Sequence, residues 1–149
     1  MELTLLRSGA CPDLRTDNRV HNFTYAFTAW EGDFTSSDVV KQAYELNIKP
    51  SVVKGGKLDA SYLSVDNDNI IIDTVKMAED GSGDIIVRLY ESKKAAVTTK
   101  LHAAFGKDVK AYACDMLENV QGEIACADGA CELSFRAFEI KTVRLCVSE

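Results

Sequence analysis

The sequence predicts a mainly β fold, an antiparallel β-sandwich with one short helix near residues 37–46. From residue 60 onward the chain is a succession of short apolar stretches, which turn-forming residues separate about every 8–12 residues. The connections are too short for helical crossovers, so neighbouring strands should be antiparallel. With 149 residues, 46% of them hydrophobic, the chain can bury one independent core, and we expect a single domain over residues 1–149.

Two stretches near the N-terminus have the pattern of strands. Leu3–Leu6 is a short apolar run that precedes a series of turn-forming residues. Asn22–Trp30 alternates so that Phe23, Tyr25 and Phe27 fall on one face, which is the period of a strand. We predict a strand at each place, with Tyr25 packed in the core in preference to stacking on a sugar.

A single helix is expected after these strands. Thr35–Asp38 has the residue types of a capping box, and apolar residues in Val39–Leu46 recur at helical spacing. Pro50 stands just beyond them, at a position typical of the residues that follow a helix. The pattern predicts a helix over Ser37–Leu46.

The rest of the chain consists of predicted strands that follow a flexible connection. Gly55 and Gly56, between two lysines, indicate an internal boundary near residues 54–60, which would separate residues 1–53 from residues 58–149. Beyond the boundary, alternating apolar residues predict the strands Tyr62–Val65, Ile70–Met77, Ile85–Glu91, Ala96–Ala103, Val109–Leu117, Gly122–Cys126, Glu132–Phe138 and Ile140–Val147.

Five cysteines at irregular spacings, without a CxxC pair, indicate no structural zinc site. If Asp128 and Gly129 form a two-residue hairpin turn, Cys126 and Cys131 lie directly opposite each other. A disulfide is then geometrically feasible, but two half-buried free thiols are the preferred interpretation in a reducing compartment. The N-terminus has no basic signal region, and no stretch approaches about 18 apolar residues, so the expected compartment is the cytoplasm.

Charge and motif content exclude several classes of function. The chain has 17 Lys and Arg against 23 Asp and Glu, a net charge of −6, so neither nucleic acid nor an anionic membrane is an expected partner. Only His21 and His102 could act as neutral-pH bases, and no HExxH, GxSxG, Walker or GxGxxG motif occurs. We therefore expect no catalytic residue and no metal ligand in this chain.

A few side chains remain candidates for contact with a sugar. Trp30 is the exposed aromatic candidate, whereas His21 is expected to be a surface or capping histidine and only secondarily a ligand. Arg88 and Glu91 share one predicted strand, and Lys76 stands on the strand before it. We interpret Lys76 and Glu91 as a structural ion pair across the strands, in preference to a sugar contact.

Three acidic residues, Glu79, Asp80 and Asp84, crowd one predicted hairpin tip. A glycosidase needs two carboxyls across a shielded sugar site, and at least one of them must have a shifted pKa. A hairpin tip is exposed to water. We expect these acids to be solvated, with a weak cation site as the alternative.

Two groups of residues carry a resemblance to a known family. The first comprises Leu3–Ser8, Asp17–Ala26, Ala43–Asn47 and Pro50; the second comprises Ser64–Ile70, Val75–Lys76, Ala78–Gly81, Ile86–Glu91 and Phe138–Leu145. The first resembles the end of the central β region of α-mannosidases of glycoside hydrolase family 38, and the second resembles the terminal β-sandwich of that family. The similarity runs in the family's order over nearly the whole chain, although Phe27–Trp30 stands where relatives commonly have Leu-Tyr-Pro-His.

The resemblance implies that the chain is a C-terminal fragment of a zinc-dependent, retaining α-mannosidase. In that family the nucleophilic Asp and most or all metal ligands lie in the preceding domains. The chain is therefore expected to be inactive alone, to hold no cofactor, and to pack against the catalytic and central domains of its parent. Zinc is expected in the full-length parent, and the function would belong to mannose metabolism.

Two other functions stay open. A stand-alone carbohydrate-binding module would bind a mannose-containing sugar on an exposed aromatic platform such as Trp30. A structural protein-interaction domain would bind no sugar and would leave the strand Phe23–Trp30 uncovered. Because an uncovered strand edge can pair with another chain, self-association of the isolated chain is also expected.

Overall fold

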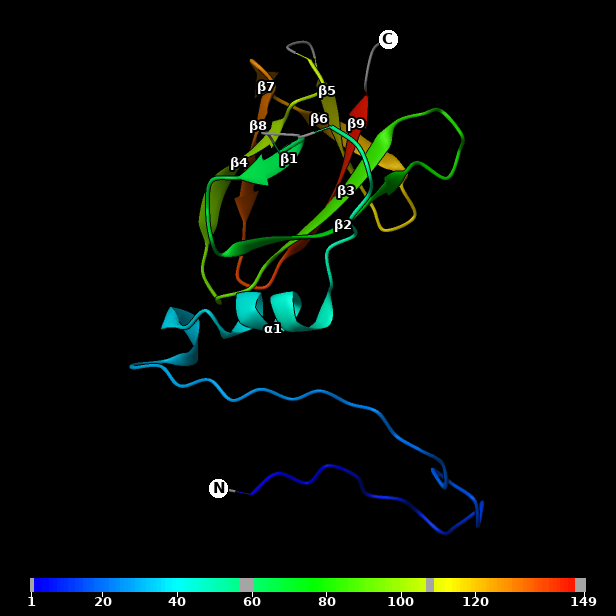
Figure 1. Cartoon of the computed structure of the whole chain (residues 1–149). Coiled ribbons are helices and arrows are strands. Elements are labelled where there is room, and N and C mark those ends of the chain that lie inside the picture. The colour runs from blue at the N-terminus through cyan, green and yellow to red at the C-terminus, as the bar shows by residue number, and fades with distance from the viewer. Residues whose placement is uncertain (1, 57–60, 107–108, 147–149) are drawn as a thin grey trace.

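A computed structural model describes residues 2–56, 61–106 and 109–146 of the chain. The described residues form two layers of antiparallel strands, with one helix and an extended N-terminal segment outside the layers (Figure 1). This arrangement confirms the predicted β-sandwich with one short helix. No helix within these ranges has the length and apolar character needed to span a membrane.

The two sheets contain four and five strands. The four-stranded sheet has the order β1 (Leu63–Val65), β4 (Val97–Ala103), β8 (Ala130–Phe135) and β7 (Cys126–Ala127). The five-stranded sheet has the order β2 (Ile70–Met77), β3 (Ile85–Glu91), β9 (Ile140–Cys146), β5 (Lys110–Cys114) and β6 (Val120–Ile124). All neighbouring strands pair antiparallel, as the short connections predicted.

The strands lie close to their predicted positions. β2 and β3 coincide with the predicted ranges, and both are alternating stretches bounded by clear turn residues. The predicted strand Gly122–Cys126 is divided between β6 and β7, because the chain changes sheets at Ala125. Val147 and residues 57–60 lie outside the described residues, so the proposed boundary near residues 54–60 stays a prediction.

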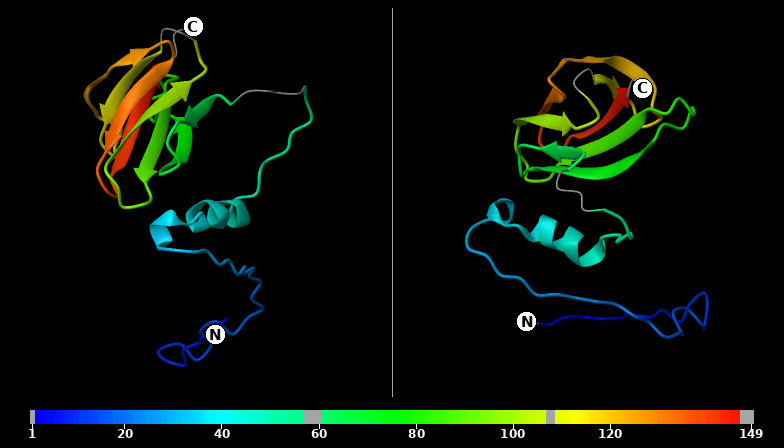
Figure 2. Two further views of the ribbon diagram at one scale, coloured as in Figure 1. Left: turned by 90° about the vertical axis from the view of Figure 1, so that its left-hand side faces the viewer. Right: turned by 45° about the horizontal axis from the view of Figure 1, so that its top comes forward.

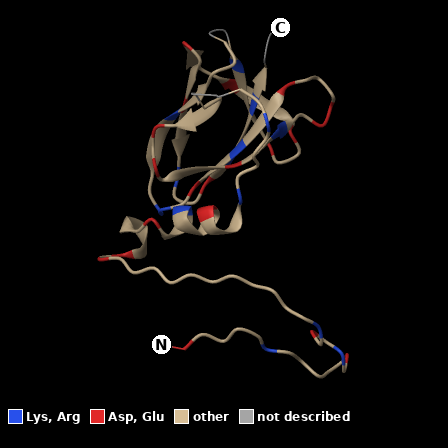
Figure 3. Ribbon diagram, in the orientation of Figure 1, with Lys and Arg blue, Asp and Glu red and all other residues tan. Residues whose placement is uncertain are grey.

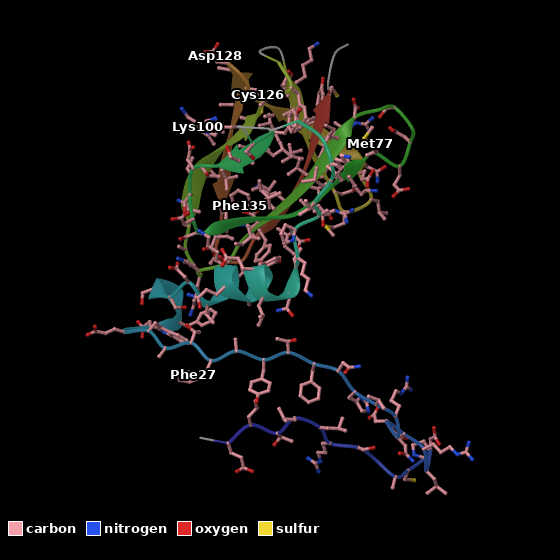
Figure 4. The ribbon with its side chains drawn as sticks, in the orientation of Figure 1. Phe27, Met77, Lys100, Cys126, Asp128 and Phe135 are labelled. Atoms are coloured by element: carbon pink, nitrogen blue, oxygen red, sulfur yellow. A yellow bond between two sulfur atoms is a disulfide. The ribbon has the colours of Figure 1, made fainter. Side chains whose placement is uncertain are left out.

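The core lies between the two sheets and is built from side chains that alternate along the strands. Its members include Ile70, Val87, Leu89, Val143 and Leu145 from the five-stranded sheet and Leu101, Leu133 and Phe135 from the four-stranded sheet. Phe135 is labelled in Figure 4. Each fully buried side chain of this kind stabilises the fold by about 1.5–3 kcal/mol. Among the described residues, none before Leu63 belongs to this core. The sandwich therefore has a core of its own.

The helix α1 (Val39–Asn47) follows a short 3-10 turn, η1 (Phe34–Ser36). The predicted capping box does not form, since Asp38 makes no side-chain capping hydrogen bond. Instead, the buried Ser37 hydroxyl donates to the carbonyl of Phe34 at 2.6 Å and accepts from the amide of Val39 at 3.4 Å. The helix consequently begins two residues later than predicted.

Residues 2–33, here called the N-terminal arm, form no strand, so the strands predicted at Leu3–Leu6 and Asn22–Trp30 are wrong. The arm extends away from the sandwich (Figure 2). Tyr25 is 64% exposed, which also contradicts its predicted core packing. Aromatic residues do alternate in this segment, but a strand needs a neighbour for its backbone hydrogen bonds, and the described residues supply none.

The predicted hairpin turn between β7 and β8 is confirmed. Asp128 and Gly129 both have positive φ, +51° and +74°, as a two-residue hairpin turn of the primed type requires. Cys126 and Cys131 are therefore directly opposite each other, and a disulfide joins them. The expectation of two free thiols is thus wrong for this structure, because the turn brings the sulfur atoms into bonding position.

Candidate functional site

Charged residues occur along the strands and loops of the sandwich (Figure 3). Several of them form ion pairs on the outer face of the five-stranded sheet. Because side chains alternate along a strand, Lys76, Arg88 and Arg144 point away from the core that Val87 and Leu145 fill. Two loops fold against this face, residues 78–84 between β2 and β3 and residues 115–119 between β5 and β6.

The second loop brings a buried acid to two cations. The Glu118 carboxylate lies 2.8 Å from Lys76 Nζ and 3.8 Å from Arg88 Nη2, and its side chain is only 8% exposed. The hydrogen bond from Lys76 holds the pKa of Glu118 below its ordinary value, and it raises the pKa of Lys76 in return. Lys76 also contacts Glu79, and Arg88 donates to the Met116 carbonyl at 3.1 Å. The two acids and the two cations therefore neutralise one another, and these four side chains have a structural role.

The predicted ion pair between Lys76 and Glu91 does not form. The register places Lys76 opposite Ile86 and Glu91 opposite Ile70, at the other end of the strand pair. Glu91 is fully buried, and its carboxylate accepts the backbone amides of Lys93 at 2.7 Å and Phe138 at 2.9 Å.

Burial favours the neutral form of Glu91, but these backbone amides outweigh it and hold the pKa of Glu91 below its ordinary value. Its two oxygen atoms join the turn after β3 to the turn before β9. Glu91 therefore acts as a buried clamp between two turns.

The acidic hairpin tip also differs from its prediction. Asp84 lies 2.6 Å from Arg144 Nε, and Asp80 lies 2.8 Å from Arg144 Nη2, so two of the three acids are paired with a cation. The hydroxyl and amide of Ser82, together with Arg144, lower the pKa of Asp80 to about 2. Glu79 and Asp80 are exposed to solvent, as expected, although each also contacts a cation. The expectation of a solvated cluster is wrong for Asp84, whose side chain is only 16% exposed.

A cleft of about 510 Å³ lies between α1 and the outer face of the five-stranded sheet. Its apolar lining comes from Phe34, Val40, Met116, Phe138 and Ile140, and its polar lining includes Asp73, Arg88 and Tyr90. We call it the α1 cleft.

A chain of hydrogen bonds ties the helix to the sheet beside this cleft. The Tyr90 hydroxyl donates to the Tyr44 hydroxyl at 3.1 Å, and Tyr44 donates to Asp73 Oδ1 at 3.0 Å. The bond with Tyr90, then burial and the bond with Asp73, raise the pKa of Tyr44. No residue of α1 is buried, so polar contacts account for much of its attachment.

The structure brings together only some of the residues that were predicted to contact sugar. Arg88 and Glu91 both line the α1 cleft. Trp30 packs edge-on against Phe34 at a ring distance of 6.4 Å, and Phe34 lines the cleft, so Trp30 stands beside it. His21 lies elsewhere on the arm, where its Nε2 is 2.7 Å from the Asp17 carbonyl oxygen. A role in sugar contact stays a prediction for all four.

Sequence reasoning missed Glu118, Tyr44 and Asp73. Glu118 has positive φ, +70°, in a loop whose neighbours are distant in sequence, and nothing in the local pattern marks it. Tyr44 belonged to the apolar stripe of the predicted helix, which hides the role of its hydroxyl group. Among the described residues, no three His, Cys, Asp or Glu side chains gather as a metal ion would require.

Comparison with known proteins places these features in a family context. Residues 69–143 match the family described as the glycosyl hydrolases family 38 C-terminal beta sandwich domain. Alpha-mannosidase 2C1 of Homo sapiens is 30% identical over 153 aligned residues, covering 97% of this chain and 15% of the relative. Alpha-mannosidase G of Dictyostelium discoideum is 32% identical over 154 aligned residues, covering 95% of this chain and 14% of the relative.

The alpha-mannosidase of Saccharomyces cerevisiae is 34% identical over 109 aligned residues, covering 62% of this chain and 10% of the relative. The chain therefore spans at most 15% of the length of these three relatives.

Proposed function

This chain belongs to the family of glycosyl hydrolases family 38 C-terminal beta sandwich domains, and we propose that it is the non-catalytic C-terminal module of an α-mannosidase. In this proposal the full-length enzyme removes terminal α-D-mannosyl residues as part of cytoplasmic mannose metabolism. The catalytic acids and the zinc ion belong to domains that precede this chain. The relatives are α-mannosidases and are much longer than this chain, which supports the proposal.

The observation that carries the proposal is the uncovered N-terminal arm. Phe23, Tyr25 and Phe27 are each more than half exposed, and Val20–Trp30 has no Asp, Glu, Lys or Arg. Figure 4 places Phe27 on the arm, apart from the sandwich. Aromatic residues are enriched in protein interfaces, and charged residues are depleted at their centres. We infer that the arm packs against the catalytic and central domains of the parent enzyme.

The acids of the sandwich support a non-catalytic role. A general acid at neutral pH needs a raised pKa, usually through burial without a partner. Glu91 and Glu118 are the buried acids among the described residues, and hydrogen bonds hold the pKa of each below its ordinary value. Asp80 and Asp84 are paired with Arg144. These hydrogen bonds and ion pairs indicate that the acids stabilise the fold.

The test measures binding of this chain to the preceding domains of its parent, produced separately, by sedimentation velocity. We expect a one-to-one complex with the natural chain, and none with a Phe23→Asp, Phe27→Asp double variant. Thr98→Asp is the matched control, because Thr98 is an exposed polar residue on the four-stranded sheet. Equal binding by the arm variant and the control, or no binding by the natural chain, would contradict the proposal.

A further inference from the structure

We propose that a groove at the edge of the four-stranded sheet binds an extended, basic segment of a partner protein as an added strand. The groove has a volume of about 520 Å³ and lies between β8 of one sheet and β5, β6 and β9 of the other. We call it the β8 groove. None of its lining residues belongs to the N-terminal arm, and the inference therefore does not depend on the proposed function.

The second half of β8 has an open edge on the side of the groove. β7 has two residues and pairs with β8 only at Ala130 and Cys131 (Figure 1). One further backbone bond runs from the Glu132 amide to the Ala125 carbonyl at 3.4 Å, at the point where the chain changes sheets. Beyond Glu132, β4 is the one strand that pairs with β8 among the described residues.

The backbone of Ser134 faces this open edge. In an antiparallel sheet the amide and carbonyl of every second residue point to the same side of the strand. The Glu132 amide points away from β4, since it bonds to Ala125, so the amide and carbonyl of Ser134 point the same way. An added strand would find an unpaired donor and an unpaired acceptor there, which are the groups that strand addition uses.

The side chains of β8 confirm this orientation. The Ser134 hydroxyl lies 3.0 Å from the hydroxyl of Thr98, which is the residue directly opposite on β4. Side chains approach this closely where the two opposite residues do not exchange backbone hydrogen bonds with each other. The backbone groups of Ser134 are therefore not used by β4.

The floor of the groove suits the alternate side chains of a strand. Leu133 and Val143 are buried and line the groove, together with Ala113 and Ile124. Every second side chain of an added strand would point toward these apolar groups, and the others would point to solvent. A helix fits less well, because its backbone groups bond to one another and would leave those of Ser134 unpaired.

The rim of the groove is acidic. Glu123, Glu132 and Glu139 line it, with Lys141 as the one basic residue among the lining side chains. Lys141 lies 3.5 Å from Glu139, which also contacts Arg136, whereas the described residues form no ion pair with Glu123 or Glu132. A second copy of the chain has the same acids and a net charge of −6, so the rim disfavours pairing between copies. A segment that alternates apolar and basic residues matches both floor and rim.

The test is titration of the capped peptide Lys-Val-Lys-Val-Lys-Val into the whole 149-residue chain, followed by amide NMR shifts and hydrogen exchange. We expect saturable shifts at the lining residues Ile124, Leu133 and Ser134. In the chain alone, the Ser134 amide should exchange faster than the Leu133 amide, which faces β4. Near saturation the peptide should slow the exchange of the Ser134 amide about tenfold, because it then has a partner.

Two variants test the two parts of the proposal. Ser134→Pro removes the unpaired amide and keeps the hydrogen bonds with β4, so it should weaken binding about tenfold. Glu132→Lys, at an exposed position, should weaken binding about fivefold, because an attraction becomes a repulsion. Asp68→Lys is the matched control, because Asp68 is exposed, lies outside the groove, and changes the net charge by the same amount.

The proposal is overturned if no saturable shift appears, if a Glu-Val-Glu-Val-Glu-Val peptide binds as tightly, or if the exchange of the Ser134 amide does not change. Equal weakening by Asp68→Lys and Glu132→Lys would show that net charge alone drives binding, and would also overturn it. Shifts at Ser134 that grow with the concentration of the chain alone would assign the groove to a second copy instead. Loss of peptide binding with an intact complex of the arm and the preceding domains would remove this groove and leave the proposed function standing.

Discussion

Removal of the Glu91 carboxylate should destabilise the sandwich more than the removal of any other single charged side chain. Glu91 is fully buried and accepts two backbone amides, from Lys93 and Phe138. Glu91→Ala leaves both amides buried without a partner, and each such loss costs about 1–3 kcal/mol. We therefore expect the free energy of unfolding to fall by about 2–6 kcal/mol.

The assay is urea unfolding at neutral pH, followed by far-ultraviolet circular dichroism. With a slope of about 2 kcal/mol per molar urea, the midpoint of Glu91→Ala should fall by about 1–3 M. Glu132→Ala is the matched control, because Glu132 is an exposed glutamate on β8 and should change the free energy of unfolding by less than about 0.5 kcal/mol. Equal midpoints for the two variants would refute the clamp role of Glu91.

The pH dependence follows from the lowered pKa of Glu91. A carboxyl group whose pKa is lower in the folded state than in the unfolded chain stabilises the fold fully above its ordinary pKa, about 4.3–4.5. This contribution is lost as the pH falls below that value. The difference in stability between the natural chain and Glu91→Gln should therefore be constant from pH 7 to about 5 and shrink towards pH 3. A difference that grows on acidification would contradict the assignment.

The remaining predictions concern other contacts. Tyr44→Phe should increase hydrogen exchange in α1 and lower the free energy of unfolding by about 1 kcal/mol, because the hydroxyl joins helix and sheet. Cys126→Ser should lower the free energy of unfolding by about 2 kcal/mol under oxidising conditions, because the variant lacks the disulfide. In excess dithiol the natural chain lacks it too, so the two should differ little. Asp80 should titrate near pH 2 by NMR, and Ser82→Ala should raise that pKa. The isolated chain should self-associate in sedimentation experiments, and Phe27→Ser should reduce the association, because Phe27 is exposed on the arm.

The sequence predicted the strands of the sandwich well because local information determines them. In Ile70–Met77 and Ile85–Glu91 the alternating residues meet the core on one side only, and turn residues fix both ends. The same reasoning failed for Asn22–Trp30, where the alternation is as clear but no partner strand lies among the described residues. Alternation specifies which face of a strand is apolar, and it does not supply the neighbour that completes a sheet.

The outer face of the five-stranded sheet was predicted less well because its contacts depend on register and on distant loops. A bulge between Ile72 and Thr74 shifts the pairing of β2 with β3, and Lys76 lies opposite Ile86. Its partner Glu118 comes from a loop 42 residues further along the chain, which no local pattern links to β2. Such contacts can be identified only from the three-dimensional arrangement of the strands and loops.

Hydrolysis of an aryl α-mannoside in the presence of zinc tests most directly whether this polypeptide is scaffold alone. We expect the purified 149-residue chain to release no phenol above the buffer rate, and we expect release when the preceding domains of the parent are present. Turnover by the purified chain that depends on zinc and stops with a chelator would contradict the assignment of the bond-breaking groups to other domains.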